Sequence, residues 1–390
     1  MVENYKHIVV GAGVAGAFAV QELAKKDPES SVLLIGQESY EPYERPPLSK
    51  YLWEGETDEA SIFYDIPDGV DVLTNTEVVS LDRHLKRIET DQGQIFDYEK
   101  LMLATGGTPR RLAGPESERV MTYRYLSDYK NLRSLLEEDS RVILVGGGFI
   151  GCEIAASLRE VGVQSSILYS GDLLGEKIFP REIAEDYTKM FVEHGVELIK
   201  GRRAKSYRLE DDKVFLQSED GQEFSTDVLI LGLGIEPNTT LAEAAGLPVD
   251  DGILVNEFFQ TRDPDIYAVG DAASYPDQLL GRRRVEHEDH ARMSAKIAAR
   301  NMAGDEQAYT YIPLFYSDIF DNEWEAYGLL DSRLDMIIED IDDGRIVYYL
   351  DGDHPKGFLN YDIYTNRKQI RSFLKEVQVD PDQVKGRVQK

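Results

Sequence analysis

Two glycine-rich segments of the same form constrain the fold of this 390-residue chain more than any other feature. Residues 11–16 read GAGVAG and residues 146–151 read GGGFIG. Each follows a short apolar, β-branched run, residues 7–10 or 142–145, and each leads into apolar residues at helical spacing. A strand, a glycine turn and a helix in this order predict a dinucleotide-binding unit. Two such units predict two bound dinucleotides, and a flavin facing a nicotinamide is the usual reason for one chain to hold both.

The three glycines of each unit have separate roles in such a fold. The first makes the tight turn, the second lets the backbone approach a pyrophosphate, and the third lets the helix pack on the strand. The anion then lies at the helix N-terminus, where unpaired N–H groups and the helix dipole stabilise it. The candidate pyrophosphate-binding residues are Gly11, Gly13 and Gly16 in the first unit and Gly146, Gly148 and Gly151 in the second.

Composition narrows the classes of partner. The chain has 43 Lys and Arg residues against 72 Asp and Glu residues, a net charge of −29. Such a surface repels nucleic acid and anionic membranes, so we expect neither as a partner. No apolar stretch approaches the ~20 residues of a membrane-spanning helix, and the first strand begins too early to leave room for a signal peptide. We therefore expect a cytoplasmic protein. The run Arg282–Arg284 predicts either a solvated loop or a local attraction for an anionic partner.

The chain has one cysteine, Cys152. A disulfide within the chain is therefore excluded, and so is a redox-active pair of cysteines. Because Cys152 follows the second glycine turn directly, we expect a small, buried and unreactive side chain. We expect no metal site, since bound cofactors would carry out the chemistry.

Apolar runs predict further elements around both units. Beyond Gly304 the pattern changes to alternating, tyrosine-rich strands and a final basic helix, which predicts a separate antiparallel domain. The other predicted elements are strands at 31–35, 101–104, 166–169, 228–231 and 266–269, and helices at about 120–140, 181–194 and 288–302.

Four segments carry a resemblance to a known family. The second glycine unit interrupts a first unit that resumes near residue 245, and residues 268–271 read AVGD. This arrangement resembles the FAD/NAD(P)H pyridine nucleotide-disulfide oxidoreductase superfamily. Residues 42–50 (PYERPPLSK) are similar to the FAD loop of its ferredoxin reductase branch. Residues 281–291 (GRRRVEHEDHA) resemble a segment of apoptosis-inducing factor and, together with residues 315–317 (FYS), monodehydroascorbate reductase.

The resemblance implies an α/β fold with two Rossmann-like (glutathione-reductase-type) dinucleotide-binding domains plus a C-terminal α+β domain. It predicts an FAD-binding domain at 1–115 and 245–305, an NAD(P)H-binding domain at 116–244, and a C-terminal antiparallel interface domain at 306–390. The implied activity is that of an FAD-dependent NAD(P)H oxidoreductase, in which NAD(P)H donates hydride to flavin N5 and electrons then pass to an acceptor.

Several residues match positions that hold FAD in the family. Gln37 occupies the usual acidic position after the second strand, so the adjacent Glu38 is the candidate for the adenosine ribose. Arg45, in a proline-stiffened loop, would pair with a phosphate or with the flavin edge. The family places an aspartate matching Asp271 on the ribityl chain, with helix capping as the alternative. Thr105 and Gly106 match the glycine exit where the chain passes close to FAD.

Lys50 and Glu153 match a lysine and a glutamate that pair beside flavin N5 in the family. An ammonium group there would stabilise the electron-rich reduced flavin, and a buried lysine needs a carboxylate to stay charged. Phe149, inside the second glycine turn, would shield the flavin until nicotinamide displaces it, or would only fill apolar space. Tyr169 ends the second strand of the second glycine unit, and we expect it to contact the nicotinamide cofactor. Gly171 stands where the family has an acid. Because no arginine is in position to bind the 2′-phosphate of NADPH, we favour NADH as the cofactor, with NADPH as the alternative.

The resemblance also implies contacts on the acceptor side. Glu286 and His287 match contacts to nicotinamide and flavin, and a histidine there could hold or relay a proton. Tyr316 matches the aromatic residue set against the isoalloxazine ring. Together with Arg292 it matches positions that meet the small anionic radical in monodehydroascorbate reductase; a surface cation and a core aromatic are the alternatives.

The sequence does not identify the electron acceptor. The candidates are a small iron–sulfur protein of the ferredoxin or rubredoxin type, a quinone, or an organic radical. The net charge of −29 disfavours an acidic ferredoxin. The alternative function is that of an apoptosis-inducing-factor-like interaction protein, in which slow turnover and a stable reduced flavin–NAD complex control association. A homodimer is a further expectation.

Overall fold

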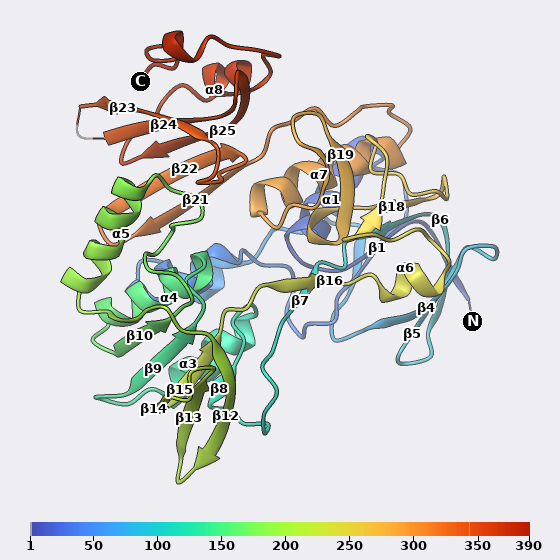
Figure 1. Cartoon of the computed structure of the whole chain (residues 1–390). Helices are drawn as coiled ribbons and strands as arrows, with labels where there is room; N and C mark the ends of the chain where they lie inside the picture. Colours follow the sequence, from blue (N-terminus) through green and yellow to red (C-terminus); the bar gives the residue numbers. More distant parts are fainter. Residues whose placement is uncertain (1, 343) are drawn as a thin grey trace. The chain divides into compact units, whose positions relative to one another are not determined.

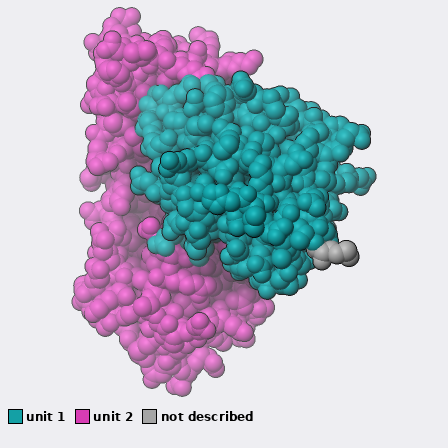
Figure 2. Space-filling view, turned by 90° about the vertical axis from the view of Figure 1, so that its right-hand side faces the viewer, with its two compact units in different colours: residues 1–44, 60–108, 236–315 teal, residues 45–59, 109–235, 316–390 magenta. Residues whose placement is uncertain are grey.

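The computed structural model describes residues 2–342 and 344–390, which form two compact units (Figures 1 and 2). Unit 1, teal in Figure 2, comprises residues 1–44, 60–108 and 236–315. Unit 2, magenta, comprises residues 45–59, 109–235 and 316–390. Segments distant in sequence therefore build each unit, as expected when one dinucleotide-binding unit interrupts another. The three-domain division stays a prediction. The chain returns to unit 1 at residue 236, and residues 45–59 pack with unit 2.

Unit 1 is organised around a parallel sheet with the order β3-β2-β1-β6, extended by the antiparallel strands β5 and β4. Strand β18 adds to β6 in parallel, and helices α1 and α7 pack against each other. The elements are β1 Glu3–Val10, α1 Val14–Lys26, β2 Val32–Ile35, β3 Val70–Leu73, β4 Val78–Asp82, β5 Arg87–Thr90, β6 Ile95–Leu103, α6 Thr240–Ala244, β17 Ile253–Leu254, β18 Ile266–Ala268, β19 Ala273–Asp277, β20 Gly281–Arg283 and α7 Glu288–Met302. Two short strands, β7 Gly107–Pro109 and β16 Ile235–Pro237, include the residues at which the chain passes from one unit to the other.

The central position of β1 follows from its composition. Its second half, residues 7–10, is buried, and it pairs on both sides, with β2 and with β6. A strand segment covered on both faces and both edges is usually apolar, and the run Ile8–Val10 meets this requirement, whereas the exposed first half of β1 is polar. The first glycine turn therefore leaves the carboxyl edge of the sheet, where open α/β sheets bind their ligands.

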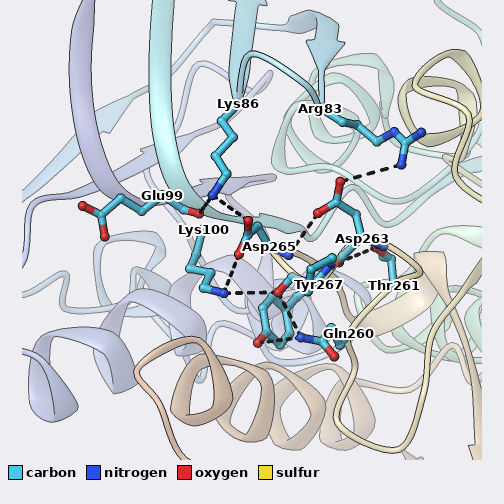
Figure 3. Close-up of polar contacts among 10 residues, drawn as sticks. Arg83, Lys86, Glu99, Lys100, Gln260, Thr261, Asp263, Asp265 and Tyr267 are labelled. Atoms are coloured by element: carbon cyan, nitrogen blue, oxygen red, sulfur yellow. Dashed lines mark hydrogen bonds and ion pairs between the residues drawn. The ribbon is translucent and has the colours of Figure 1, made fainter.

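An ion-pair network fixes the start of β18 (Figure 3). Asp265 lies between two lysines, with Oδ2 2.5 Å from Lys86 Nζ and Oδ1 2.6 Å from Lys100 Nζ. Burial alone would raise the pKa of Asp265, but the hydrogen bonds from the two lysines outweigh it and lower that pKa. The network holds the strand that leads to Asp271 against β6.

Unit 2 contains a parallel sheet of order β11-β10-β9-β15-β8 and a three-stranded sheet of order β12-β13-β14. It also contains a sheet of order β21-β22-β25-β24-β23, in which β25 pairs antiparallel with β22 and β24, and β24 pairs antiparallel with β23. The alternating strands predicted beyond Gly304 are confirmed as this last sheet. The elements are α2 Tyr51–Glu54, β8 Val120–Met121, α3 Leu126–Leu135, β9 Arg141–Val145, α4 Phe149–Glu160, β10 Gln164–Leu168, α5 Arg181–Glu193, β11 Glu197–Ile199, β12 Ala204–Glu210, β13 Lys213–Ser218, β14 Glu223–Thr226, β15 Val228–Leu231, β21 Leu314–Ile319, β22 Asn322–Gly328, β23 Asp335–Ile341, β24 Gly344–Asp351, β25 His354–Tyr361 and α8 Arg367–Leu374.

Within the described residues, the helices are all too short or too polar to cross a bilayer.

Candidate functional site

The first glycine turn connects β1 to α1 in unit 1. Gly11 has φ +113°, and a Cβ there would lie 2.1 Å from the carbonyl oxygen of Ala104, at the end of β6. A Cβ on Gly16 would lie 2.0 Å from the carbonyl oxygen of Gly11. Only glycine fits at either position, because the backbone of the strand, the turn and the helix meet there without room for a side chain.

The N-terminus of α1 is open to an anion. Gly13 is its N-cap residue, no side chain caps it, and its first turn contains no acidic residue. The first N–H groups of the helix therefore have no capping side chain, and the helix dipole favours negative charge at this end. These features fit the pyrophosphate of FAD.

The second glycine turn, between β9 and α4 in unit 2, repeats this geometry. Gly146 has φ +109°, and a Cβ there would lie 2.2 Å from the carbonyl oxygen of Gly232. A Cβ on Gly151 would lie 2.4 Å from the carbonyl oxygen of Gly146. Gly148 is the N-cap residue of α4, and no side chain caps this helix. A Cβ on Gly148 would meet no protein atom within 4 Å. The open space at Gly148 is what a pyrophosphate needs to approach the backbone.

Glu38 and Thr105 are held by neighbours in unit 1. The hydroxyl of Tyr43 donates to the carboxylate of Glu38. Thr105 Oγ1 donates to the carbonyl oxygen of Asn238 at 2.7 Å, and Asn238 Nδ2 donates back to the carbonyl oxygen of Thr105 at 2.8 Å. Gly106, with φ +64°, completes this turn and accepts the backbone N–H of Asn238. Sequence reasoning missed Asn238, whose only signal is its place after a strand-ending proline.

Asp271 lies in the short 3₁₀ turn Gly270–Ala272 after β18. Gly270 has φ +63°, and its N–H donates to Ser294 Oγ at 3.2 Å. Arg284 Nη1 donates to the carbonyl oxygen of Asp271 at 3.3 Å and pairs with Glu286 Oε1 at 2.6 Å. Arg284 thus links two residues that were predicted separately as cofactor contacts.

His287 is the N-cap residue of α7, and its ring stacks on Phe315 at 4.3 Å with an interplanar angle of 7°. Burial lowers the pKa of His287 to about 4, so the imidazole is neutral at pH 7. Further along α7, Arg292 Nη2 lies 2.7 Å from Asp289 Oδ1. Arg292 belongs to unit 1 and Tyr316 to unit 2, so the prediction that they share a substrate stays a prediction.

A buried ion pair in unit 2 joins Lys50 to Glu153. Lys50 Nζ lies 3.1 Å from Glu153 Oε1, and both residues are less than 10% exposed, at 3% and 7%. Ser49 Oγ donates to Glu153 Oε2 at 2.7 Å, and Ser317 Oγ donates to Oε1 at 2.6 Å. Hydrogen bonds to both carboxylate oxygens compensate for the loss of water around this buried charge.

The same lysine faces two further groups of strand β21. Lys50 Nζ lies 3.9 Å from Asp318 Oδ2 and 5.0 Å from the centre of the Tyr316 ring. Tyr51 donates to Asp318 Oδ2 at 2.9 Å. The structure therefore brings together the predicted residues Lys50, Glu153 and Tyr316. Ser317 and Asp318 were missed, although their place beside Tyr316 in an alternating strand was a signal.

Three other predicted residues are placed within unit 2. Arg45 Nη1 donates to the carbonyl oxygen of Arg124 at 2.7 Å, and its guanidinium lies 5.3 Å from the centre of the Tyr125 ring. Phe149 begins α4, and its ring centre lies 5.2 Å from that of the buried Trp324. Tyr169 is buried beside the second glycine turn, and burial raises its pKa to about 12. Their roles toward a cofactor stay predictions.

Comparison with known proteins decides the family. A family model described as pyridine nucleotide-disulphide oxidoreductase matches residues 5–295. The chain belongs to this family. It is 31% identical to monodehydroascorbate reductase 3 of Arabidopsis thaliana, over 84% of this chain and 81% of that protein, and 31% identical to putidaredoxin reductase of Pseudomonas putida, over 90% and 87%. Putidaredoxin reductase in its covalent complex with putidaredoxin superposes with a TM-score of 0.89 at 29% identity, covering 97% of this chain and 95% of that one.

These findings confirm the fold and the class of activity. The protein is an FAD-dependent NAD(P)H oxidoreductase with two dinucleotide-binding units and a C-terminal sheet, and its cofactors are FAD and NAD(P)H. Unlike the dithiol enzymes after which the family is named, this member has a single cysteine. Cys152 is 2% exposed, and burial raises the pKa of its thiol to about 12, so the thiolate is not formed at neutral pH.

Proposed function

We propose that this oxidoreductase passes electrons from NAD(P)H, by way of FAD, to a small iron–sulfur protein. The observation that carries the proposal is the match to putidaredoxin reductase in complex with putidaredoxin, which covers 97% of this chain and so includes the C-terminal sheet. The sequence relatives alone favour no acceptor, because reductases of a small radical and of a redox protein are equally similar at 31% identity.

We assign the first glycine turn to FAD and the second to NAD(P)H. Gly11, Gly13 and Gly16 would hold the FAD pyrophosphate. In the family resemblance the lysine matching Lys50 lies beside the flavin ring, and we assign it that role here. FAD supplies the conversion between two-electron and one-electron transfer when bound. The part of Lys50 is to present a fixed positive charge, which Glu153 maintains.

The charge of the chain bears on the acceptor. The net charge of −29 slows encounter with an acidic protein unless a basic patch is displayed locally. The run Arg282–Arg284 does not supply an obvious one, because Arg282 donates to two backbone carbonyls, Arg283 lies 3.4 Å from Asp277, and Arg284 pairs with Asp251 and Glu286. We therefore expect an acceptor whose docking face is not strongly acidic.

A small anionic radical is the second candidate, because the chain is as similar to a monodehydroascorbate reductase as to putidaredoxin reductase. Arg292, which would meet such an anion, already pairs with Asp289. An anionic substrate would have to compete with that carboxylate.

Stopped-flow kinetics of the purified, FAD-loaded protein test the proposal. NADH or NADPH should bleach the flavin absorbance, and oxidised ferredoxin-type proteins should restore it faster than a quinone or monodehydroascorbate radical does. Faster reoxidation by the radical would replace the iron–sulfur acceptor with the second candidate. A reduced form that persists with every acceptor and changes sedimentation would instead favour the apoptosis-inducing-factor-like function.

A further inference from the structure

The loop that follows β10 lies beside the second glycine turn. A Cβ on Gly147 would lie 2.9 Å from Leu174 Cδ2 and 3.3 Å from Tyr169 Cβ. The loop is fixed on its other side as well, since Gly201 donates to the carbonyl oxygen of Gly171 and the Leu174 N–H donates to Thr188 Oγ1. In dinucleotide-binding units this loop carries the acid that binds the adenosine ribose of NAD.

Gly171 stands where that acid is expected, and a different carboxylate occupies the space beside it. A Cβ on Gly171 would lie 2.2 Å from Glu176 Oε1 and 2.7 Å from its Cδ. The φ of Gly171 lies outside the left-handed region, so a side chain is excluded here by the Glu176 carboxylate and not by backbone strain.

The carboxylate of Glu176 is held in place by one of its two oxygens. Oε2 accepts the backbone N–H of Asp172 at 3.0 Å and that of Leu173 at 3.2 Å. These two bonds orient Oε1 toward Gly171, the position at which the family acid would present its own oxygens. A carboxylate fixed in this way can accept hydrogen bonds from the adjacent hydroxyls of the adenosine ribose with little loss of side-chain entropy.

We propose that Glu176 replaces the missing acid at position 171 and makes the enzyme select NADH over NADPH. This inference rests on the assignment of the second glycine turn to NAD(P)H. The carboxylate of Glu176 accepts a hydrogen bond from the adenosine ribose, whereas the 2′-phosphate of NADPH is repelled by the negative charge of Glu176. The backbone N–H of Arg202 donates to the Tyr169 carbonyl oxygen, which places this residue near the loop. Its guanidinium contributes little attraction for a phosphate, because Nε pairs with Asp220 Oδ2 at 3.2 Å.

Calorimetric titration of the FAD-loaded protein with ADP-ribose and with 2′-phospho-ADP-ribose tests the inference without any redox step. We expect the wild type to bind ADP-ribose at least about tenfold more tightly, the worth of one hydrogen bond to a charged group. In Glu176→Gln, which keeps the shape and an acceptor oxygen, this preference should fall about tenfold. Asp172→Asn is the matched control, because it removes the same charge from the same loop; its preference should change less than about threefold.

A double variant separates recognition from loop structure. Gly171→Glu in a Glu176→Gly background returns the carboxylate to the family position, and the preference for ADP-ribose should be restored. A wild type that binds both ligands equally, or a Glu176→Gln variant with unchanged preference, would overturn the inference while leaving the proposed function intact. Failure to bind either ligand would overturn the assignment of the second glycine turn and the inference with it.

Discussion

Lys50 and Glu153 form an ion pair of 3.1 Å that is shielded from water on a loop and a helix far apart in sequence. Two serine hydroxyls complete the coordination of the glutamate, and Asp318 lies 3.9 Å from the lysine. A pair of this kind contributes little net stability against an apolar replacement, but it is costly to break from one side. The pair is therefore better suited to hold a fixed charge in a buried place than to stabilise the fold.

Removing one partner should destabilise the protein. Glu153→Gln leaves Lys50 with only the more distant Asp318, so we expect a loss of about 3 kcal/mol in the free energy of unfolding. The double variant Lys50→Met with Glu153→Gln should recover part of this loss, because no buried charge is then left uncompensated. Urea denaturation of the three proteins measures both values. A double variant less stable than Glu153→Gln would contradict the compensation argument.

The glycines of the two turns should separate cofactor binding from folding. Gly11→Ala places a methyl group 2.1 Å from the Ala104 carbonyl and strains φ, so the purified variant should lose its FAD and its yellow colour. Gly148→Ala places the methyl group in open space, so the melting temperature should change little while binding of NAD(P)H weakens. Flavin absorbance, thermal unfolding and nucleotide titration distinguish the two effects. Equal loss of FAD in both variants would show that the two turns do not act separately.

Buried histidines should make stability depend on pH in the acidic range. Burial lowers the pKa of His290 to about 3, against an ordinary value near 6.5. The unfolded chain therefore binds more protons between these values, and stability falls as the pH decreases below about 6.5. Each such histidine contributes a slope of up to about 1.4 kcal/mol per pH unit.

The variant His290→Gln isolates this contribution from that of the carboxylates. Its free energy of unfolding should depend less steeply on pH between 4 and 6, by about the slope of one histidine. His84→Gln, which removes an exposed histidine, is the control. Parallel curves for the wild type and His290→Gln would show that His290 is protonated in the folded state.

The single thiol should be unreactive in the native protein. Cys152 is buried and its pKa is raised to about 12, so a thiol reagent such as Ellman's reagent should label it only when the chain unfolds. One equivalent should react in urea. Rapid labelling of the folded, FAD-loaded protein would indicate that α4 opens locally.

Local sequence patterns were sufficient to predict most of the helices and strands and both glycine turns. The strand before each glycine turn, the helix after it and the alternating strands of the C-terminal sheet follow from the periodicity of apolar residues and from the positions where only glycine fits. These signals are local because strand pleat, helical repeat and backbone sterics act over a few residues. The helix predicted at about 120–140 is shorter, Leu126–Leu135, because residues 120–121 form a strand.

The sequence by itself determined that the chain contains two dinucleotide-binding units, and where the glycine turn of each unit lies. Only the tertiary structure decided which side chains contact each other. It places Ser317 on Glu153, Asn238 on Thr105 and the Glu176 carboxylate in the space beside Gly171. Such contacts depend on how distant segments pack, and a hydrogen bond or ion pair is set by distances of a few ångströms that no short sequence pattern encodes.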